Sequence, residues 1–219
     1  MVVKWLCSLV IKAFGPNPKI VGLNPTRATE EINDTNNISN MRGGLPGLIH
    51  KERRQTMKLA MTGHRPKSLG MGYEIPNPIY DKIYNAILEK FQELSPEKII
   101  SGMALGVDTA ACWAAIELNI PFVAAVPCDG QDSMWPEDTK RIYRHLLSLA
   151  EKVVIVSPGS YAPDKMHTRD RWMIDNSDCL LAVWNGVEKG GTYGTVRYAQ
   201  KQQLVRPEYK IHRINPTCL

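Results

Sequence analysis

The chain has 219 residues, of which 43% are hydrophobic and 22% charged. This balance is typical of one folded domain with an extension and excludes a fibrous or wholly disordered protein. The apolar runs are strand-sized, far shorter than the ~20 residues of a membrane helix, so we expect no contact with a membrane. Five cysteines are widely spaced without a C-x-x-C pair, which excludes a disulfide framework and a sequence-evident zinc site. We therefore expect a cytoplasmic protein that needs neither metal nor cofactor.

The net charge of +5 is unevenly distributed along the chain. Residues 1–56 carry eight Lys and Arg against four Asp and Glu, whereas the other 163 residues carry nineteen against eighteen. Residues 57–219 are nearly neutral and lack the excess of positive charge that is typical of a domain that binds duplex nucleic acid. Nucleic acid stays open as a partner but is not favoured.

Residues 15–56 are rich in Asn, Pro, Gly and Thr and show neither helical nor alternating periodicity. Ordering each backbone residue costs roughly 1–2 kcal/mol, and this stretch has few apolar groups to offset that cost. We expect residues 1–56 to form a poorly ordered or loosely packed leader and residues 57–219 to form the folded domain. A nucleic-acid arm built on Arg53 and Arg54 is the less favoured interpretation.

From Met57 onward, short apolar runs alternate with segments of helical periodicity. The runs predict strands at 57–62, 98–101, 121–126, 152–157, 179–184 and 209–214. The periodic segments predict helices at 80–91, 107–118, 136–149, 163–176 and 192–202. Near-continuous apolar strands that alternate with helices indicate a mostly parallel sheet covered on both faces. We therefore predict a Rossmann-like α/β domain.

In such a sheet, ligands bind beyond the carboxyl ends of the strands. Two of the loops expected there are rich in glycine and lead into helices, where backbone can approach a ligand and free N–H groups attract phosphate. Neither loop matches G-x-G-x-x-G or the P-loop, which disfavours a standard NAD or Walker site. The candidate ligand-binding residues in the loops are Thr62, Gly63, His64, Arg65, Ser101, Gly102, Gly106, Asp108, Trp184, Gly190, Gly191, Thr192, Gly194 and Thr195.

Several of these side chains have more than one interpretation. Asp108 suits the first turn of a helix, and it either binds ribose hydroxyls, braces its own loop or caps the helix. His64 and Arg65 follow a strand and are costly to bury without partners, which favours ligand contact over loop bracing. Trp184, like Trp135, either stacks on a base or belongs to the core. Cys128 has no evident catalytic partner and is expected to be a small buried side chain, so no catalytic residue is assigned.

Several ordered motifs resemble a known family. They are M-K-L-A-M-T-G-H-R-P at 57–66, I-S-G-M-A-L-G-V-D-T-A-A at 100–111, I-P-F-V-A-A-V-P at 120–127, R-W-M-I-D at 171–175 and G-G-T…V-R-Y-A at 190–199. In these blocks the chain resembles the SLOG superfamily of Rossmann-like proteins and, within it, the YpsA-like group of bacterial and phage proteins. The resemblance implies a nucleotide or nucleotide-derived ligand whose phosphate lies on the Gly190–Thr195 loop.

Two related groups suggest different functions. The LOG phosphoribohydrolases carry M-H-x-R-K and then P-G-G-x-G-T-x-E-E, whereas this chain has M-H-T-R-D at 166–170 and G-G-T-Y-G-T-V-R at 190–197. The likeness implies that Arg169 reaches the ligand pocket, although a surface arginine is the plainer interpretation. Arg197 replaces a carboxylate of the LOG pattern and favours holding an anion over breaking a glycosidic bond.

DNA-processing protein A, a single-stranded DNA-binding protein, shares the S-G-x-A-x-G-x-D block of residues 101–108. We therefore expect a binding module for a nucleotide-like small molecule, with a role in signalling or phage–host conflict. A nucleotide-processing hydrolase and a single-stranded DNA-binding protein are the alternatives. A homo-oligomer is left open.

Overall fold

The computed structural model describes residues 57–69 and 77–219, so the predicted leader lies outside the described residues. The strands are β1 (Lys58–Gly63), β2 (Lys98–Ser101), β3 (Phe122–Val126), β4 (Lys152–Ile155), β5 (Cys179–Val183) and β6 (Lys210–Ile214). The α-helices are α2 (Pro78–Leu94), α3 (Val107–Glu117), α4 (Glu137–Leu149), α5 (Pro163–Asp175) and α6 (Gly190–Gln203). Two short 3₁₀ helices, Pro66–Leu69 and Pro216–Cys218, were not predicted.

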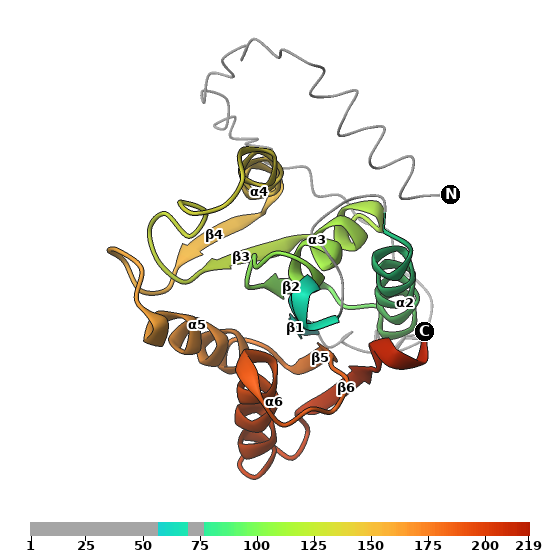
Figure 1. The fold of residues 1–219 in the computed structure, drawn as a ribbon. Coiled ribbons are helices and arrows are strands. Elements are labelled where there is room, and N and C mark those ends of the chain that lie inside the picture. Colours follow the sequence, from blue (N-terminus) through green and yellow to red (C-terminus); the bar gives the residue numbers. More distant parts are fainter. Residues whose placement is uncertain (1–56, 70–76) are drawn as a thin grey trace, which may run out of the picture.

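The strands form one sheet in the order β4-β3-β2-β1-β5-β6, and every pairing is parallel. Figure 1 shows α2, α3 and α4 on one face of this sheet and α5 and α6 on the other. The chain moves outward from β1 to β4 and then returns to the other side of β1 with β5. The predicted Rossmann-like architecture is confirmed, and its topological switch point lies between β1 and β5.

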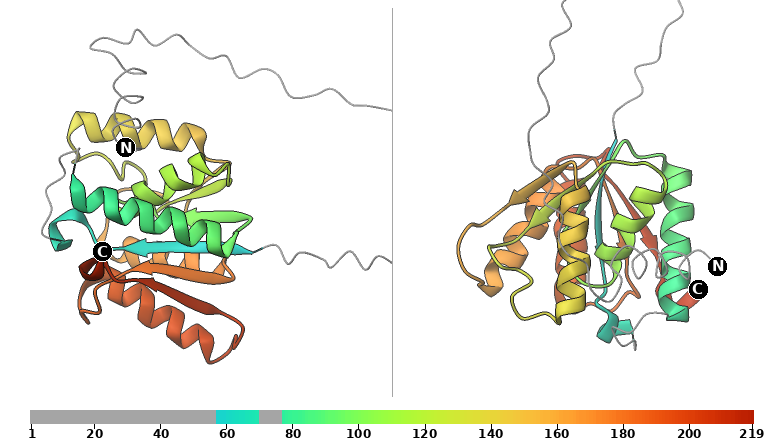
Figure 2. Two further views of the ribbon diagram at one scale, coloured as in Figure 1. Left: turned by 90° about the vertical axis from the view of Figure 1, so that its right-hand side faces the viewer. Right: turned by 90° about the horizontal axis from the view of Figure 1, so that it is seen from above.

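Successive side chains of the central strands point to opposite faces of the sheet, because a strand is pleated. In β1, Leu59 and Met61 belong to the core beneath α2, α3 and α4, whereas Ala60 belongs to the core beneath α5 and α6. The residues of both cores are buried, which explains why these strands read as continuous apolar runs. Figure 2 shows the resulting layers from two further directions.

Local sequence accounts for where the helices begin and pack. The side chain of Asn77 accepts hydrogen bonds from the first turn of α2, and Pro78 takes the first helical position. Helix α3 is lined with alanines, including Ala110, Ala111 and Ala114, that let it lie close on β1 and β2. Over the described ranges, no helix is both long and apolar enough to cross a membrane.

Candidate functional site

Buried polar side chains gather at the carboxyl edge of the sheet. Of the buried polar or charged residues in the described part of the chain, all but Ser177 lie there: Thr62, His64, Ser101, Asp108, Arg169, Thr192 and Thr195. Burying such groups is costly unless they find partners, so each must be stabilised by the fold or reserved for a ligand.

The connection between β2 and α3 is braced from within. Ser101 Oγ donates to the Asp108 carbonyl at 3.2 Å and accepts from Met103 N–H at 3.2 Å. Asp108 Oδ2 accepts from Ala104 N–H at 3.2 Å, so of the three interpretations the structure shows loop bracing. Burial raises the pKa of Asp108 to about 6, and the nearby Arg169 charge opposes that rise.

Arg169 is buried within helix α5, so it is not a surface arginine. Its Nε donates to Asp170 Oδ1 at 2.8 Å, and Nη1 donates to the Gly102 carbonyl. Gln131, which sequence reasoning missed, donates through Nε2 to the carbonyls of Gly102 and Met103 at 3.4 and 3.3 Å. Arg169 thus couples α5 to the glycine-rich turn after β2.

His64 and Arg65, at the end of β1, differ in their surroundings. His64 is buried, with Nε2 at 2.8 Å from Asn185 Oδ1, whereas Arg65 is exposed. Asn185 Oδ1 also accepts from Val187 N–H at 3.1 Å, and the backbone N–H of Asn185 lies 3.3 Å from His64 Nε2. His64 therefore ties the turn after β1 to the turn after β5, across the topological switch point.

Two side chains lie close to the indole ring of Trp184. Tyr193 stacks on the indole with centroids 6.1 Å apart, and the Arg213 guanidinium lies 4.9 Å from its ring. The indole N–H donates to the Val187 carbonyl at 2.9 Å. Tyr193 and Arg213 therefore already occupy part of the indole surface on which a base could stack.

The sequence predicted a loop at Gly190–Thr195, but these residues are helical, because α6 already begins at Gly190. Glycine has a low helix propensity, which is why the sequence pattern placed the start at Thr192. Lys189 is extended at the N-cap and provides no side-chain hydrogen bond to the first turn. A Cβ built on Gly190, Gly191 or Gly194 would meet nothing within 4 Å. The helix therefore begins with backbone that a ligand can approach.

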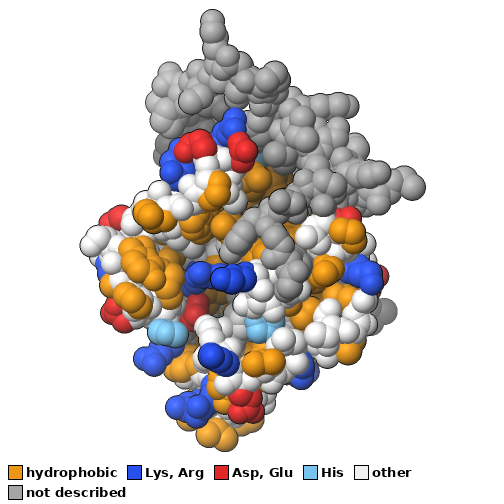
Figure 3. Space-filling view, in the orientation of Figure 1, with side chains coloured by type: hydrophobic (Ala, Val, Ile, Leu, Met, Phe, Trp, Pro, Cys, Tyr) orange, Lys and Arg blue, Asp and Glu red, His pale blue; other side chains and the backbone are white. Residues whose placement is uncertain are grey.

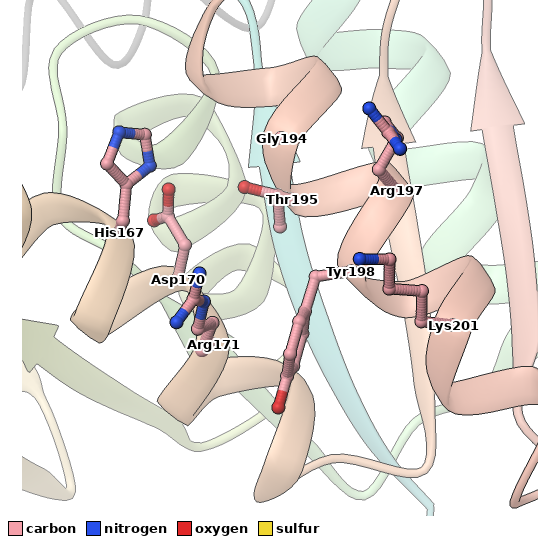
Figure 4. A pocket seen from close by; sticks show the side chains of 8 residues that line it. All are labelled: His167, Asp170, Arg171, Gly194, Thr195, Arg197, Tyr198 and Lys201. Carbon is pink, nitrogen blue, oxygen red and sulfur yellow. The ribbon is translucent and has the colours of Figure 1, made fainter.

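Between α5 and α6 lies a cavity of about 240 Å³. Its walls are His167, Asp170 and Arg171 from α5 and Gly194, Thr195, Arg197, Tyr198 and Lys201 from α6. Figure 4 shows Asp170 and Thr195 facing the space between the helices, with Arg171 and Lys201 on opposite sides of Tyr198. Three permanent cations against one carboxylate make this cavity suited to an anion.

Three of the predicted residues, Gly194, Thr195 and Arg197, line the cavity, and Arg169 reaches it through Asp170. Thr62, Gly63, Ser101, Gly102, Gly106 and Asp108 lie instead at the ends of β1 and β2. Arg171, Tyr198 and Lys201 were missed. The signal was present, because Gly194, Tyr198 and Lys201 fall at i, i+4 and i+7 on one face of α6.

Residues 57–69 and 77–219 contain no cluster of His, Cys, Asp or Glu that could hold a metal ion. Cys128 is fully buried, as expected of a small core side chain. Trp135 is partly buried and packs edge-on against Tyr143, with ring centroids 5.2 Å apart. The chemistry available at the carboxyl edge is therefore that of charged side chains, hydroxyls and backbone N–H groups.

The parallel sheet, its switch point and the glycine-rich start of α6 define a Rossmann-like protein with its polar site at the carboxyl edge. The chain belongs to the YpsA family, described as the YspA SLOG family, whose model matches residues 59–219. The predicted resemblance to this family is thereby confirmed.

Named relatives extend over most of the domain. The chain is 32% identical over 156 residues to the SPbeta prophage-derived protein YoqJ of Bacillus subtilis, covering 62% of this chain and 91% of YoqJ. It is 28% identical over 153 residues to a UPF0398 protein of Bacillus thuringiensis, covering 66% of this chain and 83% of that protein. A structure of DNA processing protein A from Streptococcus pneumoniae superposes with a TM-score of 0.49 at 18% identity, covering 71% of this chain and 58% of that one.

Proposed function

We propose that this protein binds an anionic, nucleotide-like small molecule at the carboxyl edge of the sheet, with a phosphate on the first turn of α6. The observation that carries this proposal is the open start of α6. Its first N–H groups have no side-chain cap, and Gly191 and Gly194 leave the backbone uncovered. The N-terminal end of a helix attracts phosphate through its dipole and its free N–H groups.

The surroundings of this turn support an anion with polar substituents. Thr192 and Thr195 are buried in the first two turns of α6, and Thr195 lines the cavity that holds the cations. Asp170 lines the same cavity and shares a charge-assisted hydrogen bond with Arg169, so its second oxygen suits a ligand hydroxyl. A ribose phosphate combines these features in one molecule.

The site supports binding more than glycosidic cleavage. Cleavage of an N-glycosidic bond develops positive charge on the ribose, which a nearby carboxylate stabilises. At the positions where the LOG pattern has a pair of glutamates, this chain has Arg197 and Tyr198, and both line the cavity. Asp170, the one carboxylate among the described residues that line the cavity, is already paired with Arg169.

The place of this binding in the cell is suggested by one relative alone. YoqJ is described as prophage-derived, which supports a role for nucleotide binding in phage–host conflict. Such a role uses the ligand as a signal and requires no turnover.

The test is calorimetric titration with nucleoside mono-, di- and triphosphates against the wild type, Gly191→Asp and Gly191→Ala. A Cβ at Gly191 meets nothing within 4 Å and its backbone is not in the left-handed region, so both variants should fold. The added carboxylate of Gly191→Asp should repel phosphate and lower affinity at least about tenfold, or about 1.4 kcal/mol. Gly191→Ala is the matched control and should bind far better than Gly191→Asp. Absence of binding by the wild type, or equal binding by Gly191→Asp, would contradict the proposal.

A second assay separates binding from catalysis. Purified protein incubated with AMP and other nucleoside monophosphates should release no free base above the uncatalysed background, as judged by chromatography. Turnover near the ~1–10³ s⁻¹ usual for enzymes, lost in Asp170→Asn, would replace the binding module with a hydrolase.

A further inference from the structure

The cavity between α5 and α6 is small for a complete ligand. Its volume of about 240 Å³ falls below the roughly 300–1,000 Å³ typical of small-molecule sites. The cavity adjoins the open first turn of α6 through Gly194 and Thr195, which lie one turn after Gly191. A ligand bound at that turn would therefore place only one of its ends in the cavity.

The cations of this cavity have no anionic side-chain partner among residues 57–69 and 77–219. In these ranges, the side chains of Arg171, Arg197 and Lys201 form no salt bridge and donate no hydrogen bond. Other arginines are engaged: Arg144 pairs with Asp132, and Arg206 donates to two backbone carbonyls. Three unpaired cations around one cavity repel one another and are stabilised when an anion binds between them.

Two of the three cations are held in position by aromatic rings. The Arg171 guanidinium lies 5.6 Å from the Tyr198 ring, and the Arg197 guanidinium lies 5.7 Å from the Tyr193 ring. A guanidinium over a ring engages its flat face, so the N–H donors along its edge stay available for phosphate oxygens. Tyr198 is itself fixed, because its hydroxyl donates to Asp175 at 3.0 and 3.2 Å.

The spacing along α6 limits which ligands can reach from its first turn to the cations of the cavity. Arg197 follows Gly191 by six residues and Lys201 by ten, or about 9 and about 15 Å along a helix that rises 1.5 Å per residue. The Arg and Lys side chains cover part of this length, and the adjacent phosphates of a pyrophosphate cover less of the remainder than two phosphates on opposite sides of a nucleoside. A nucleoside between the two phosphates supplies a spacer of the right order.

We propose that the cavity between α5 and α6 is a second anion subsite, and that the ligand carries two phosphate groups separated by a nucleoside. The class comprises nucleoside 3′,5′-bisphosphates and 5′-phosphorylated dinucleotides. One phosphate lies on the first turn of α6, as the proposed function has it, and the second lies among Arg171, Arg197 and Lys201. Asp170, neutralised by Arg169, faces the sugar between them.

The experiment is a titration of the full chain with AMP, ADP, adenosine 3′,5′-bisphosphate and the dinucleotide pApA. The separated-phosphate ligands should bind the wild type at least tenfold more tightly than AMP, whereas ADP should gain much less. The double variant Arg197→Gln/Lys201→Gln should lose most of this gain. Lys152→Gln also removes one positive charge, at the amino edge of the sheet, and should leave every affinity unchanged. Thermal unfolding of each variant verifies that it is folded.

The outcomes distinguish the two proposals. If AMP binds through Gly191 but the separated-phosphate ligands gain nothing, or the gain survives in the double variant, the second subsite is overturned and the proposed function stands. If none of the four ligands binds the wild type, both are overturned. If a long single-stranded oligodeoxynucleotide binds more tightly than pApA and depends on the same two side chains, a nucleic-acid strand replaces the small molecule.

Discussion

The two glycine-rich segments at the carboxyl edge have similar composition but opposite surroundings. A Cβ built on Gly102 would lie against the Arg169 guanidinium and 2.8 Å from Asp108 Oδ2, and one on Gly106 would lie 2.7 Å from Pro66. A Cβ built on Gly191 or Gly194 would meet nothing within 4 Å. The first segment uses glycine so that the protein can pack against its own backbone. In the second, glycine leaves backbone uncovered.

The polar groups follow the same division. Ser101, Asp108, Arg169 and Gln131 around the first segment are joined by hydrogen bonds within the protein. The side chains of Arg171, Arg197 and Lys201 beside the second have neither salt bridges nor hydrogen bonds among the described residues. Figure 3 shows Lys and Arg side chains exposed over the region of α5 and α6. The buried polar groups with partners inside the protein indicate a scaffold, whereas the exposed cations remain available to a ligand.

The largest expected effect is on the packed segment. The methyl group of Gly102→Ala would push the Arg169 guanidinium and the Asp108 carboxylate away from residue 102. Overpacking of this kind costs typically 1–3 kcal/mol. Loss of the hydrogen bond from Arg169 to the Gly102 carbonyl would add to that cost. We expect a fall of about 3 kcal/mol in the free energy of unfolding, measured by chemical denaturation. A fall below 0.5 kcal/mol would show that this segment is as open as the start of α6.

The next effect concerns pH. Burial raises the pKa of Asp108 from 3.8 to about 6, so in this interval the native protein holds a proton that the unfolded chain has lost. The stabilising contribution is complete below pH 3.8 and is lost as the pH rises through about 6. Two pKa units correspond to about 3 kcal/mol at most. Asp108→Asn stays neutral at every pH, so its stability relative to the wild type should rise by about 2 kcal/mol between pH 4 and pH 7. Denaturation curves at both pH values test this, and a constant difference between the two proteins would refute it.

The division between the two segments also sets how far sequence could predict the site. Alternation and helical periodicity located every strand and α-helix of the described domain within three residues, because burial on two faces leaves a strong apolar pattern. Arg169 and Asp108 were predicted as site residues, but composition could not show that Arg169 pairs with Gly102 and Asp170. The contact between Arg169 and Gly102 joins residues that are 67 positions apart in the sequence.

The start of α6 was predicted two residues late for a local reason. Glycine disfavours helix, so a helix that begins with Gly-Gly reads as a loop. The missed cations Arg171 and Lys201 belong to two different helices, and their convergence depends on how α5 packs against α6. The i, i+4, i+7 pattern on α6 indicates a shared face, but not that the face borders a cavity.

A smaller effect on the free energy of unfolding is expected at Tyr193, which packs the start of α6 against the rest of the domain. Tyr193 stacks on Trp184, supports Arg197 and donates to Glu188 at 3.1 Å. Aromatic pairs contribute about 0.5–1.5 kcal/mol beyond area burial, so Tyr193→Leu should lower the free energy of unfolding by about 1 kcal/mol. Tyr193→Phe keeps both ring contacts and is the matched control, with a loss of less than 0.5 kcal/mol. If Phe costs as much as Leu, the hydroxyl contact to Glu188 matters and the stacking does not.

The smallest effect has the opposite sign from the first. Gly194 lies inside α6 with open space at its Cβ and an ordinary helical backbone, and glycine inside a helix costs about 0.5–1 kcal/mol relative to alanine. Gly194→Ala should therefore raise the free energy of unfolding by about 0.5 kcal/mol, where Gly102→Ala lowers it. The same methyl group would protrude into the cavity between α5 and α6, so affinity for adenosine 3′,5′-bisphosphate should fall even as stability rises. Denaturation and titration of one protein preparation measure both quantities. A variant that gains stability without losing affinity would show that the open side of Gly194 faces solvent and not the ligand.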